Sequence, residues 1–323
     1  MFKPILSALA YSAAAAAALL CAVPADAQQD YPNRPIRIIV GPGTDLLARM
    51  VGEKLTEAWG QGVVIDARPA AGGIVAGDAA AKAPPDGYTL LLSSSSYTAN
   101  SVLQPKMPYD LVTDLRPVCL LSTIPIVVVA NPALPIHNLK ELAAAARAKP
   151  GQLNYASAGN GTAPHLSGEM FKQQAHIAIT HVPYKGAGPA ITDVMGGQVQ
   201  LSFSTAPPVL GAVQSGKLRA LGVTGTRRFK GLPEVPSAAE QGYPDFSYVA
   251  WNGIHAPAKT PAAIIEKLSA KMVEIMRTAN ARERAEKAGF DPISLATREF
   301  EQFQEQDIAR LKVIIREGNI KAD

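Results

Sequence analysis

Strand signals and helix signals alternate along most of this chain of 323 residues, and this alternation limits its fold more than any other feature. Apolar, β-branched runs at Ile36 to Val40 and at Ile126 to Ala130 predict buried strands. Between such runs lie stretches with helical spacing, the first from about Thr44 to Ala58. Further expected elements are strands at Val63 to Ile65 and Tyr88 to Leu92, an Ala-rich segment from Ile74 to Lys82, and a helix after Asn138, whose capping box includes Glu141. The alternation predicts an α/β fold with mainly parallel sheets flanked by helices.

The last third of the chain is richer in helix signals. Thr260 and Pro261 mark a helix start, and an apolar stripe follows at helical spacing: Ile264, Ile265, Leu268, Met272 and Ile275. Further helices are predicted from about Asn280 and Arg298. Because this block contains too little strand to form its own sheet, we expect it to pack on the N-terminal part of the chain.

A strand, a glycine-rich turn and a helix start follow one another between residues 153 and 164. Leu153 to Ala156 predicts a short strand, and Ser157 to Gly161 predicts a turn. Thr162 is a candidate N-cap for a helix that starts with Ala163 and Pro164. Such a turn leaves backbone N–H groups unpaired at the positive end of a helix dipole, which suits a carboxylate or phosphate.

The same pattern recurs about twenty residues later. Ile179 to Pro183 predicts a strand, Gly186 and Gly188 predict a turn, and Pro189 fits a first helical position. Two anion-friendly helix starts so close in the sequence suggest one binding cleft.

Composition favours a globular protein that binds neither nucleic acid nor metal. Hydrophobic residues make up 47% of the chain and charged residues 18%, which argues for a filled core. The formal net charge of +4 is spread along the chain without a long basic run, so we expect no nucleic-acid partner. His165, His176 and His181 lack the spacing of a zinc site, and we expect no metal or other cofactor.

Residues 1–27 have the pattern of a secretory signal peptide. Lys3 supplies the positive start, Ile5 to Leu20 supply an apolar stretch too short for a comfortable membrane span, and Ala25-Asp26-Ala27 is a small-x-small cleavage site. Two leucines precede Cys21, which is unlike a lipid-attachment site, so lipidation is not expected. Cleavage after Ala27 leaves Cys119 as the remaining cysteine, and its apolar neighbours predict a buried, inert thiol.

Several motifs give the chain a family resemblance. They are Tyr31-Pro-Asn-Arg-Pro-Ile-Arg37, Pro84-Pro-Asp-Gly-Tyr-Thr-Leu90, Pro108-Tyr-Asp110, Tyr155-Ala-Ser-Ala-Gly-Asn-Gly-Thr162, His181-Val-Pro-Tyr-Lys-Gly186, Gly216-Lys-Leu-Arg-Ala220, Leu232-Pro-Glu-Val-Pro236 and Ala256-Pro-Ala-Lys-Thr-Pro261. In this order they resemble the substrate-binding receptors of tripartite tricarboxylate transporters, the Bug family of periplasmic proteins. The resemblance runs from about Tyr31 to the C-terminus.

The resemblance implies a fold, a function and partners. The fold would be a two-lobed periplasmic binding protein of type II, with residues 28–124 and 249–323 in lobe 1 and residues 125–248 in lobe 2. The protein would capture a small carboxylate-bearing metabolite between the lobes and deliver it to the large and small integral subunits of a membrane transporter. We expect a periplasmic monomer.

The resemblance, where its motifs match, and the expected strand ends together indicate a set of ligand-binding residues. Ligands of open α/β sheets bind outside the carboxyl ends of the strands, which is where these motifs fall. The expected ligand-binding residues are Gly43, Thr44, Asp45, Ser94, Ser95, Thr98, Ser157, Gly159, Asn160, Gly161, Thr162, His165, Tyr184, Lys185, Gly186, Ser204 and Thr205.

The loop from Gly41 to Asp45 departs from the family pattern. It is shorter by about four residues and lacks an aromatic residue and one glycine that in the family help to close over the ligand carboxylate. Asp45 has two interpretations: it stabilises the dipole of the following helix, or it faces the cleft and repels an anion. Lys185 either faces the cleft or points to solvent.

Two other functions are open to this sequence. A hydrolase could use the same cleft, but Ser157 lies in Ala-Ser-Ala and not in a Gly-x-Ser-x-Gly elbow, so we expect no enzyme. A periplasmic sensor that feeds a signalling partner would share these motifs and differ in that partner.

Overall fold

The computed structural model describes residues 31–41, 45–68 and 71–320. The predicted signal peptide and Cys21 therefore lie outside the described residues, as do Gly43 and Thr44 of the expected site. Residues 34–323 form one unit, and every element below belongs to it. Within the described residues, no helix is both long enough and apolar enough to cross a membrane.

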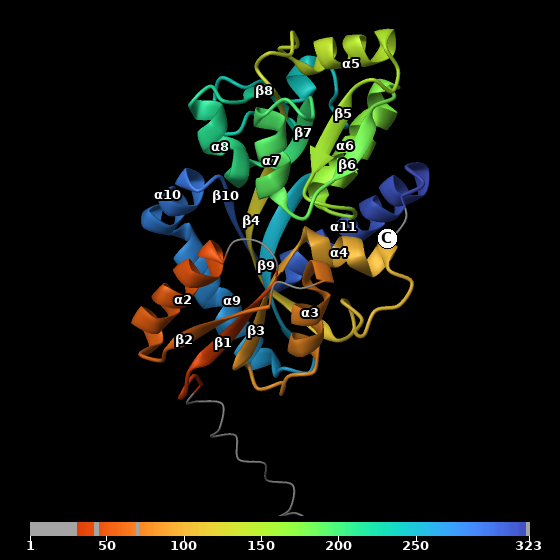
Figure 1. Cartoon of the computed structure of the whole chain (residues 1–323). Helices are drawn as coiled ribbons and strands as arrows, with labels where there is room; N and C mark the ends of the chain where they lie inside the picture. Colours follow the sequence, from red (N-terminus) through yellow and green to blue (C-terminus); the bar gives the residue numbers. More distant parts are fainter. Residues whose placement is uncertain (1–30, 42–44, 69–70, 321–323) are drawn as a thin grey trace, which may run out of the picture. The chain divides into compact units, whose positions relative to one another are not determined.

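Ten strands pair in two groups that share one long strand (Figure 1). The first group, sheet A, comprises β1 (Ile36–Val40), β2 (Val63–Ala67), β3 (Thr89–Ser94), β9 (Val249–Pro257), β10 (Asp291–Ala296) and the first part of β4 (Leu115–Ala130). The second, sheet B, comprises the end of β4 with β5 (Asn154–Ser157), β6 (Thr180–Pro183), β7 (Leu201–Thr205) and β8 (Arg219–Val223).

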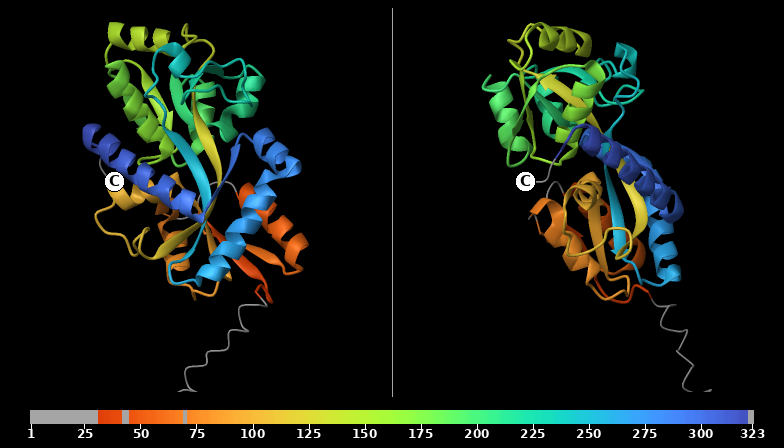
Figure 2. Two further views of the ribbon diagram at one scale, coloured as in Figure 1. Left: turned by 180° about the vertical axis from the view of Figure 1, so that it is seen from behind. Right: turned by 90° about the vertical axis from the view of Figure 1, so that its right-hand side faces the viewer.

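Strand β4 changes partners in its middle. Leu115 to Pro125 pairs with β9, whereas Ile126 to Ala130 pairs with β7 and β8. Figures 1 and 2 show β4 and β9 side by side where the two groups of strands meet. The change of partner falls close to the predicted lobe boundary near residue 124, while the two lobe ranges themselves stay a prediction.

The α/β class is confirmed, but the sheets are mixed and not mainly parallel. β1 is parallel to β2 and β3, and β5 is parallel to β6 and β7, as the strand–helix alternation predicts. Every pair made by β4 or β9 is antiparallel. The mixed character of the sheets results from pairing between strands that are distant in the sequence. β4 and β9 run in opposite directions between the two sheets, so they cannot both be parallel to the strands beside them.

Helices cover the sheets on both faces (Figure 2). They are α2 (Leu46–Trp59), α3 (Ile74–Ala81), α4 (Ser95–Leu103), α5 (Leu139–Ala148), α6 (Ala163–Ala175), α7 (Ala187–Met195), α8 (Ala206–Gln214), α9 (Ala262–Arg277), α10 (Ala279–Lys287) and α11 (Thr297–Glu317), with 3₁₀ turns η2 (Ala71–Gly73) and η3 (Ala239–Gln241). α5 to α8 lie around sheet B, and α2 to α4 lie around sheet A (Figure 1).

Half of the capping box predicted at Asn138 is present at the start of α5. The Asn138 side chain accepts a hydrogen bond from the backbone N–H of Glu141 at 2.8 Å. The Glu141 carboxylate accepts not from the Asn138 N–H but from the His137 N–H at 2.7 Å, one residue before the helix cap. The first bond satisfies an orphan amide of the first turn and thereby fixes where α5 begins.

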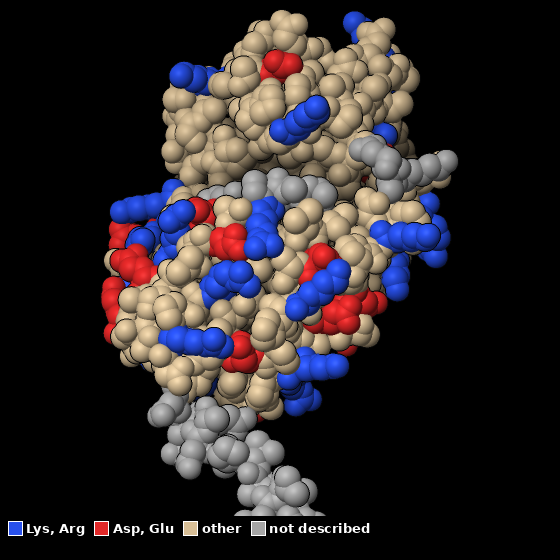
Figure 3. Space-filling view, turned by 60° about the horizontal axis from the view of Figure 1, so that its bottom comes forward, with Lys and Arg blue, Asp and Glu red and all other residues tan. Residues whose placement is uncertain are grey.

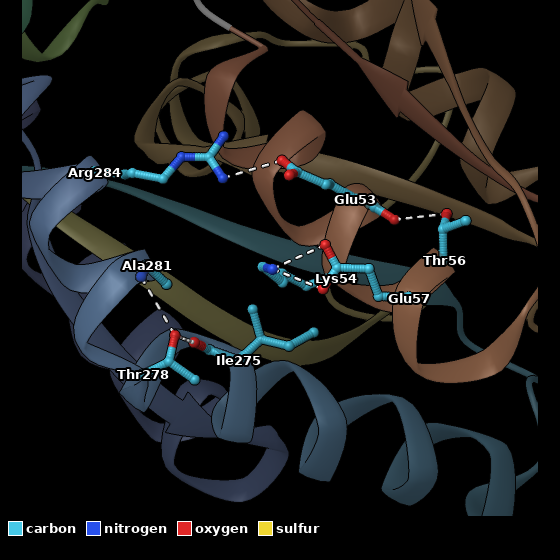
Figure 4. Close-up of polar contacts among 9 residues, drawn as sticks. Glu53, Lys54, Thr56, Glu57, Ile275, Thr278, Ala281 and Arg284 are labelled. Atoms are coloured by element: carbon cyan, nitrogen blue, oxygen red, sulfur yellow. Dashed lines mark hydrogen bonds and ion pairs between the residues drawn. The ribbon is translucent and has the colours of Figure 1, made fainter.

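The C-terminal helices pack as the sequence predicts. The apolar stripe of α9 is buried, and α9 contacts β4, β10 and α2. Arg284 of α10 points to Glu53 of α2, with 3.0 Å between Nη1 and Oε2 (Figure 4). On its other side α10 pairs Glu286 with Lys230, which follows β8. Figure 3 shows Lys and Arg interspersed with Asp and Glu over the lower part of the face it presents, without a patch of one sign.

Two element boundaries differ from the prediction. α7 starts at Ala187, so Pro189 occupies its third position and not its first. The backbone N–H groups of the first three helical positions have no acceptor within the helix. A proline, which lacks this N–H, is therefore tolerated at the third position. β4 begins at Leu115, eleven residues before the predicted strand. The first part of the strand was not predicted because its apolar run is interrupted in the sequence by Pro117, Ser122, Thr123 and Pro125.

A candidate ligand-binding cleft

A cavity of about 1010 Å³ lies at the carboxyl ends of the parallel strands of both sheets. Its walls include residues that end or directly follow β1, β3, β5, β6 and β7, together with parts of β4 and β9. The N-termini of α4, α6, α7 and α8 all contribute lining residues. This is where ligands bind in open α/β sheets, because crossing loops leave a crevice there.

The structure brings eight of the expected site residues to this cavity. They are Ser94, Ser95, Asn160, Gly161, Thr162, Lys185, Gly186 and Thr205. Whether they contact a ligand stays a prediction.

Thr98 points into the core behind α4. Its hydroxyl donates to Oδ2 of Asp307 on α11 at 2.7 Å, and Trp251 Nε1 donates to the same oxygen at 2.8 Å. Burial raises the pKa of the Asp307 carboxyl, and the two donated bonds oppose that shift. Thr98 and Asp307 therefore connect α4 and α11 to β9, and Thr98 is not among the lining residues.

Asp45 forms an ion pair with Arg49 one turn along α2. Its Oδ2 lies 2.6 Å from Arg49 Nη2, and Asp45 occupies the position directly before the helix. It does not line the cavity. Of the two interpretations of Asp45, the structure agrees with the one that places it at the helix terminus.

The amides of Gly159 and Gly161 already have acceptors within the loop. Gly159 N–H donates to Ser157 Oγ at 3.1 Å, and Gly161 N–H donates to His165 Nδ1 at 3.0 Å. The expectation that this turn leaves both amides unpaired is therefore wrong, because two side chains of the same motif bind them. Thr162 is the N-cap residue of α6, but its hydroxyl donates to Gly159 O at 2.6 Å and caps no helix amide.

Two stacked histidines support this loop from behind. The rings of His165 and His181 lie 4.0 Å apart and 7° from parallel, and Tyr155 stacks on the far face of His181 at 4.8 Å. Burial lowers the pKa of His181 to about 3, with smaller contributions from His165 and Lys172. His181 is therefore neutral near pH 7, and its Nε2 lies 2.7 Å from Ser157 Oγ.

Ser157 Oγ and His181 Nε2 are as close as a catalytic nucleophile and its general base, but a substrate in the cavity could not reach the serine oxygen. Ser157 is fully buried, and its oxygen also accepts from Gly159 N–H. The nearby carboxylate of Glu169 binds Tyr155 and Lys172. The geometry therefore makes Ser157 and His165 supports of the loop.

The β6–α7 loop places Lys185 and Gly186 on the cavity wall and turns Tyr184 away. Tyr184 donates to Asp193 Oδ2 of α7 at 2.7 Å. Burial and the Asp193 carboxylate raise the pKa of Tyr184 to about 12. Lys185 is exposed, and no carboxylate of the described chain lies within ion-pair distance of its ammonium group. Ser204 is buried beside Thr205, to whose carbonyl it donates at 3.1 Å.

Sequence reasoning missed the apolar part of the cavity wall. Ile124 and Ala250 are paired across β4 and β9, and Trp251, Pro207 and Phe290 lie beside them along the lining. Single buried hydrophobic residues in strands and turns look like core in a sequence, so no local signal marks them. The signal that could have identified Ile124 and Ala250 is their place near residue 124 and residue 249, where the chain was expected to cross between the lobes.

Cys119 is a buried free thiol in β4, as predicted, and burial raises its pKa to about 12. Among the residues that the structure describes, His, Cys, Asp and Glu side chains form no group able to hold a metal ion.

Comparison with known proteins gives consistent matches. Residues 47–320 match the tripartite tricarboxylate transporter family receptor. Protein BugT of Bordetella pertussis is 37% identical over 297 residues, which cover 90% of this chain and 91% of BugT. Among solved structures, R. palustris Rpa4515 with adipate has a TM-score of 0.83 and 30% identity over 90% of this chain and 99% of that one. MatC from Rhodopseudomonas palustris with bound malate has a TM-score of 0.77 and 29% identity over 88% of this chain and 100% of that one.

Proposed function

The chain belongs to the tripartite tricarboxylate transporter receptor family, and from this premise we propose that it captures a carboxylate-bearing metabolite in the cleft and delivers it to a membrane transporter of that type. Members of the family are periplasmic solute-binding receptors with a two-lobed α/β fold. The family resemblance carried by the sequence motifs is confirmed.

One observation of the cleft carries the proposal for this chain. Lys185 is the single formally charged residue among the described lining residues, and four helix N-termini face the same cavity. A protein wall with one cation and four helix N-termini, and without a described carboxylate, suits an anionic ligand because the positive ends of the helix dipoles face it. The adipate and malate bound by two similar proteins are carboxylates.

Three finer features belong to the same proposal. Residues 1–27 are a signal peptide cleaved after Ala27, and the mature receptor acts as a monomer with the large and small integral transporter subunits. Residues 28–124 with 249–323 and residues 125–248 form the two lobes. The change of partners in β4 after Pro125 and the start of β9 at Val249 support these lobe ranges.

Thermal unfolding with a carboxylate panel tests the function. A ligand present at about a hundredfold excess over its Kd should stabilise the folded protein by about 2.7 kcal/mol. The diamide of adipate serves as the uncharged control, and Lys185→Gln should weaken binding of every carboxylate that stabilises the wild type. If no carboxylate shifts the unfolding temperature, the proposed function is wrong.

A further inference from the structure

Three polar side chains form a row across the middle of sheet A. Asn252 of β9 is paired with Ser94 of β3 on one side and with Ser122 of β4 on the other. Directly opposed residues of antiparallel strands project their side chains from the same face of the sheet. The side chains of Ser94, Asn252 and Ser122 are therefore neighbours, and we call them the polar row.

The polar row lies on the face of the sheet that meets the cleft. Successive residues of a strand point to opposite faces, and the residue before Asn252 points to α11. There the Trp251 indole packs on Phe300 and Phe303. Asn252 consequently points away from α11, and both Asn252 and Ser94 line the cavity. Both are partly exposed, so a ligand in the cavity can reach their side chains.

The polar row has unused hydrogen-bonding capacity. Within the described residues, the side chains of Ser94 and Asn252 have no hydrogen-bond partner, and Oγ of the fully buried Ser122 has none either. An amide carries two N–H donors and a carbonyl acceptor, and each hydroxyl can donate and accept. Because a buried polar group without a partner costs about 1 to 3 kcal/mol, a ligand that supplies both a donor and an acceptor here is favoured.

The positive groups of the cleft lie mainly on its other side. Lys185 and the N-termini of α6, α7 and α8 belong to the part of the chain around sheet B. The described lining from sheet A contributes the N-terminus of α4 and uncharged side chains. A first carboxylate is therefore stabilised most on the sheet B side. A second carboxylate at the polar row would find no cation in the described lining, and burying an unpaired charge costs more than burying an uncharged group.

From this arrangement we infer that Asn252 determines ligand specificity, by binding an uncharged carboxamide at the end of the ligand remote from its carboxylate. The inference rests on the proposed function and names the ligand class as a monocarboxylate with a terminal amide. A carboxamide pairs with the Asn252 amide through two reciprocal N–H···O bonds, which neither a carboxylate nor an alkyl group can form.

Titration calorimetry on the unmodified protein compares acids of equal shape. For chains of the length of succinate, glutarate and adipate, they are the monoamide, the diacid, and the branched alkyl acid in which methyl groups replace the amide nitrogen and oxygen. At the chain length that binds best, the monoamide should bind about tenfold or more tighter than either counterpart.

Two results of this titration overturn the inference and leave the proposed function standing. Equal affinity for the monoamide and the alkyl acid would show that water alone satisfies the polar row. Tighter binding of the diacid would show that the polar row accepts a second charge. Absence of binding by every acid overturns the inference and the proposed function together.

Variants of Asn252 locate the effect. Asn252→Leu places an alkyl group of similar size in the polar row and should remove the preference for the monoamide over the alkyl acid. Asn252→Asp should weaken the diacid more than the monoamide, because like charges repel. Asn154→Leu, at the start of β5 and not among the lining residues, is the matched control and should keep the wild-type preference.

A folded Asn252→Leu protein that keeps the preference for the monoamide would overturn the role of Asn252. If Asn252→Leu does not fold, the order of the acids on the wild type decides together with Asn252→Asp, and an unchanged ratio of diacid to monoamide in Asn252→Asp contradicts the inference.

Discussion

At the residue scale, Gly161 occupies a backbone conformation that other residues adopt at a cost. Its φ is +70°, and a Cβ would lie 2.8 Å from Leu103 Cδ1. Gly161→Ala should destabilise the protein by about 1 to 2 kcal/mol through its backbone conformation. Because the substitution also displaces the N–H held by His165, ligand affinity should fall by about tenfold. Urea unfolding and ligand titration measure the two effects.

Gly188→Ala provides the matched control for that prediction. Gly188 lies inside α7 in the neighbouring loop–helix unit, and no atom comes within 4 Å of the Cβ position. Alanine there should leave binding intact and stabilise the helix by up to about 1 kcal/mol. Equal affinities of the two variants would contradict the role assigned to Gly161.

His255 should make stability depend on pH. Its ring is fully buried in β9 between Ser93 Oγ and Gln304 Oε1, each 2.7 Å away, and burial lowers its pKa from 6.5 to about 4. Between these values the unfolded chain binds the proton and the folded chain does not. The contribution of His255 is thus complete above pH 6.5 and is lost as the pH falls toward 4. Burial of His181 acts in the same direction.

Unfolding midpoints in urea at about pH 7.5, about pH 6 and about pH 5 measure this dependence. His255→Gln should flatten it, because glutamine does not titrate in this range. A wild-type midpoint that is independent of pH over this range would refute the prediction.

At the element scale, the start of α5 depends on one side chain. Asn138→Ala removes the acceptor of the Glu141 N–H and should cost about 1 kcal/mol, while Asn138→Ser keeps an uncharged acceptor and should cost less. Chemical denaturation of the three proteins checks the order. Equal losses in both variants would show that the cap contributes little.

The ends of an element could be predicted from the sequence where neighbouring residues determine them. They could not be predicted where pairing with a strand distant in the sequence determines them. The start of α5 follows from Asn138, since a capping side chain acts within one turn. Thr162 and Pro261 mark the starts of α6 and α9 without a side-chain cap hydrogen bond. The length of β4 and the direction of its pairs depend on β9, more than one hundred residues away. Pro117 and Pro125 interrupt the local strand signal, and the pairing with β9 overrides them.

The candidate site divides in the same way. Ser95, Asn160 and Lys185 lie at strand–helix junctions, which the motifs identify, and all three line the cleft. The roles of Ser157 and His165 behind the loop could not be predicted, because they depend on how His181 stacks after folding. Phe290 was missed because a lone aromatic residue after a helix has no functional signature.

At the scale of the whole molecule, cleft residues come from elements of both sheets, so a ligand that contacts both should favour a closed arrangement. Small-angle scattering should give a smaller radius of gyration at ligand saturation than without ligand. The Lys185→Gln protein at the same ligand concentration is the control for incomplete saturation. Identical profiles of free and saturated wild type would indicate a rigid receptor.

The position of Trp251 gives the protein a built-in optical probe. Trp251 belongs to the cleft wall, but its indole is fully buried on the side of α11, where it donates to Asp307 and packs on Phe300 and Phe303. The other tryptophan, Trp59, ends α2. A Trp59→Phe protein would therefore carry a single indole emitter between the cleft strand β9 and α11. Its emission maximum would report any change in the packing of β9 on α11 when a ligand binds, in solution and without a label.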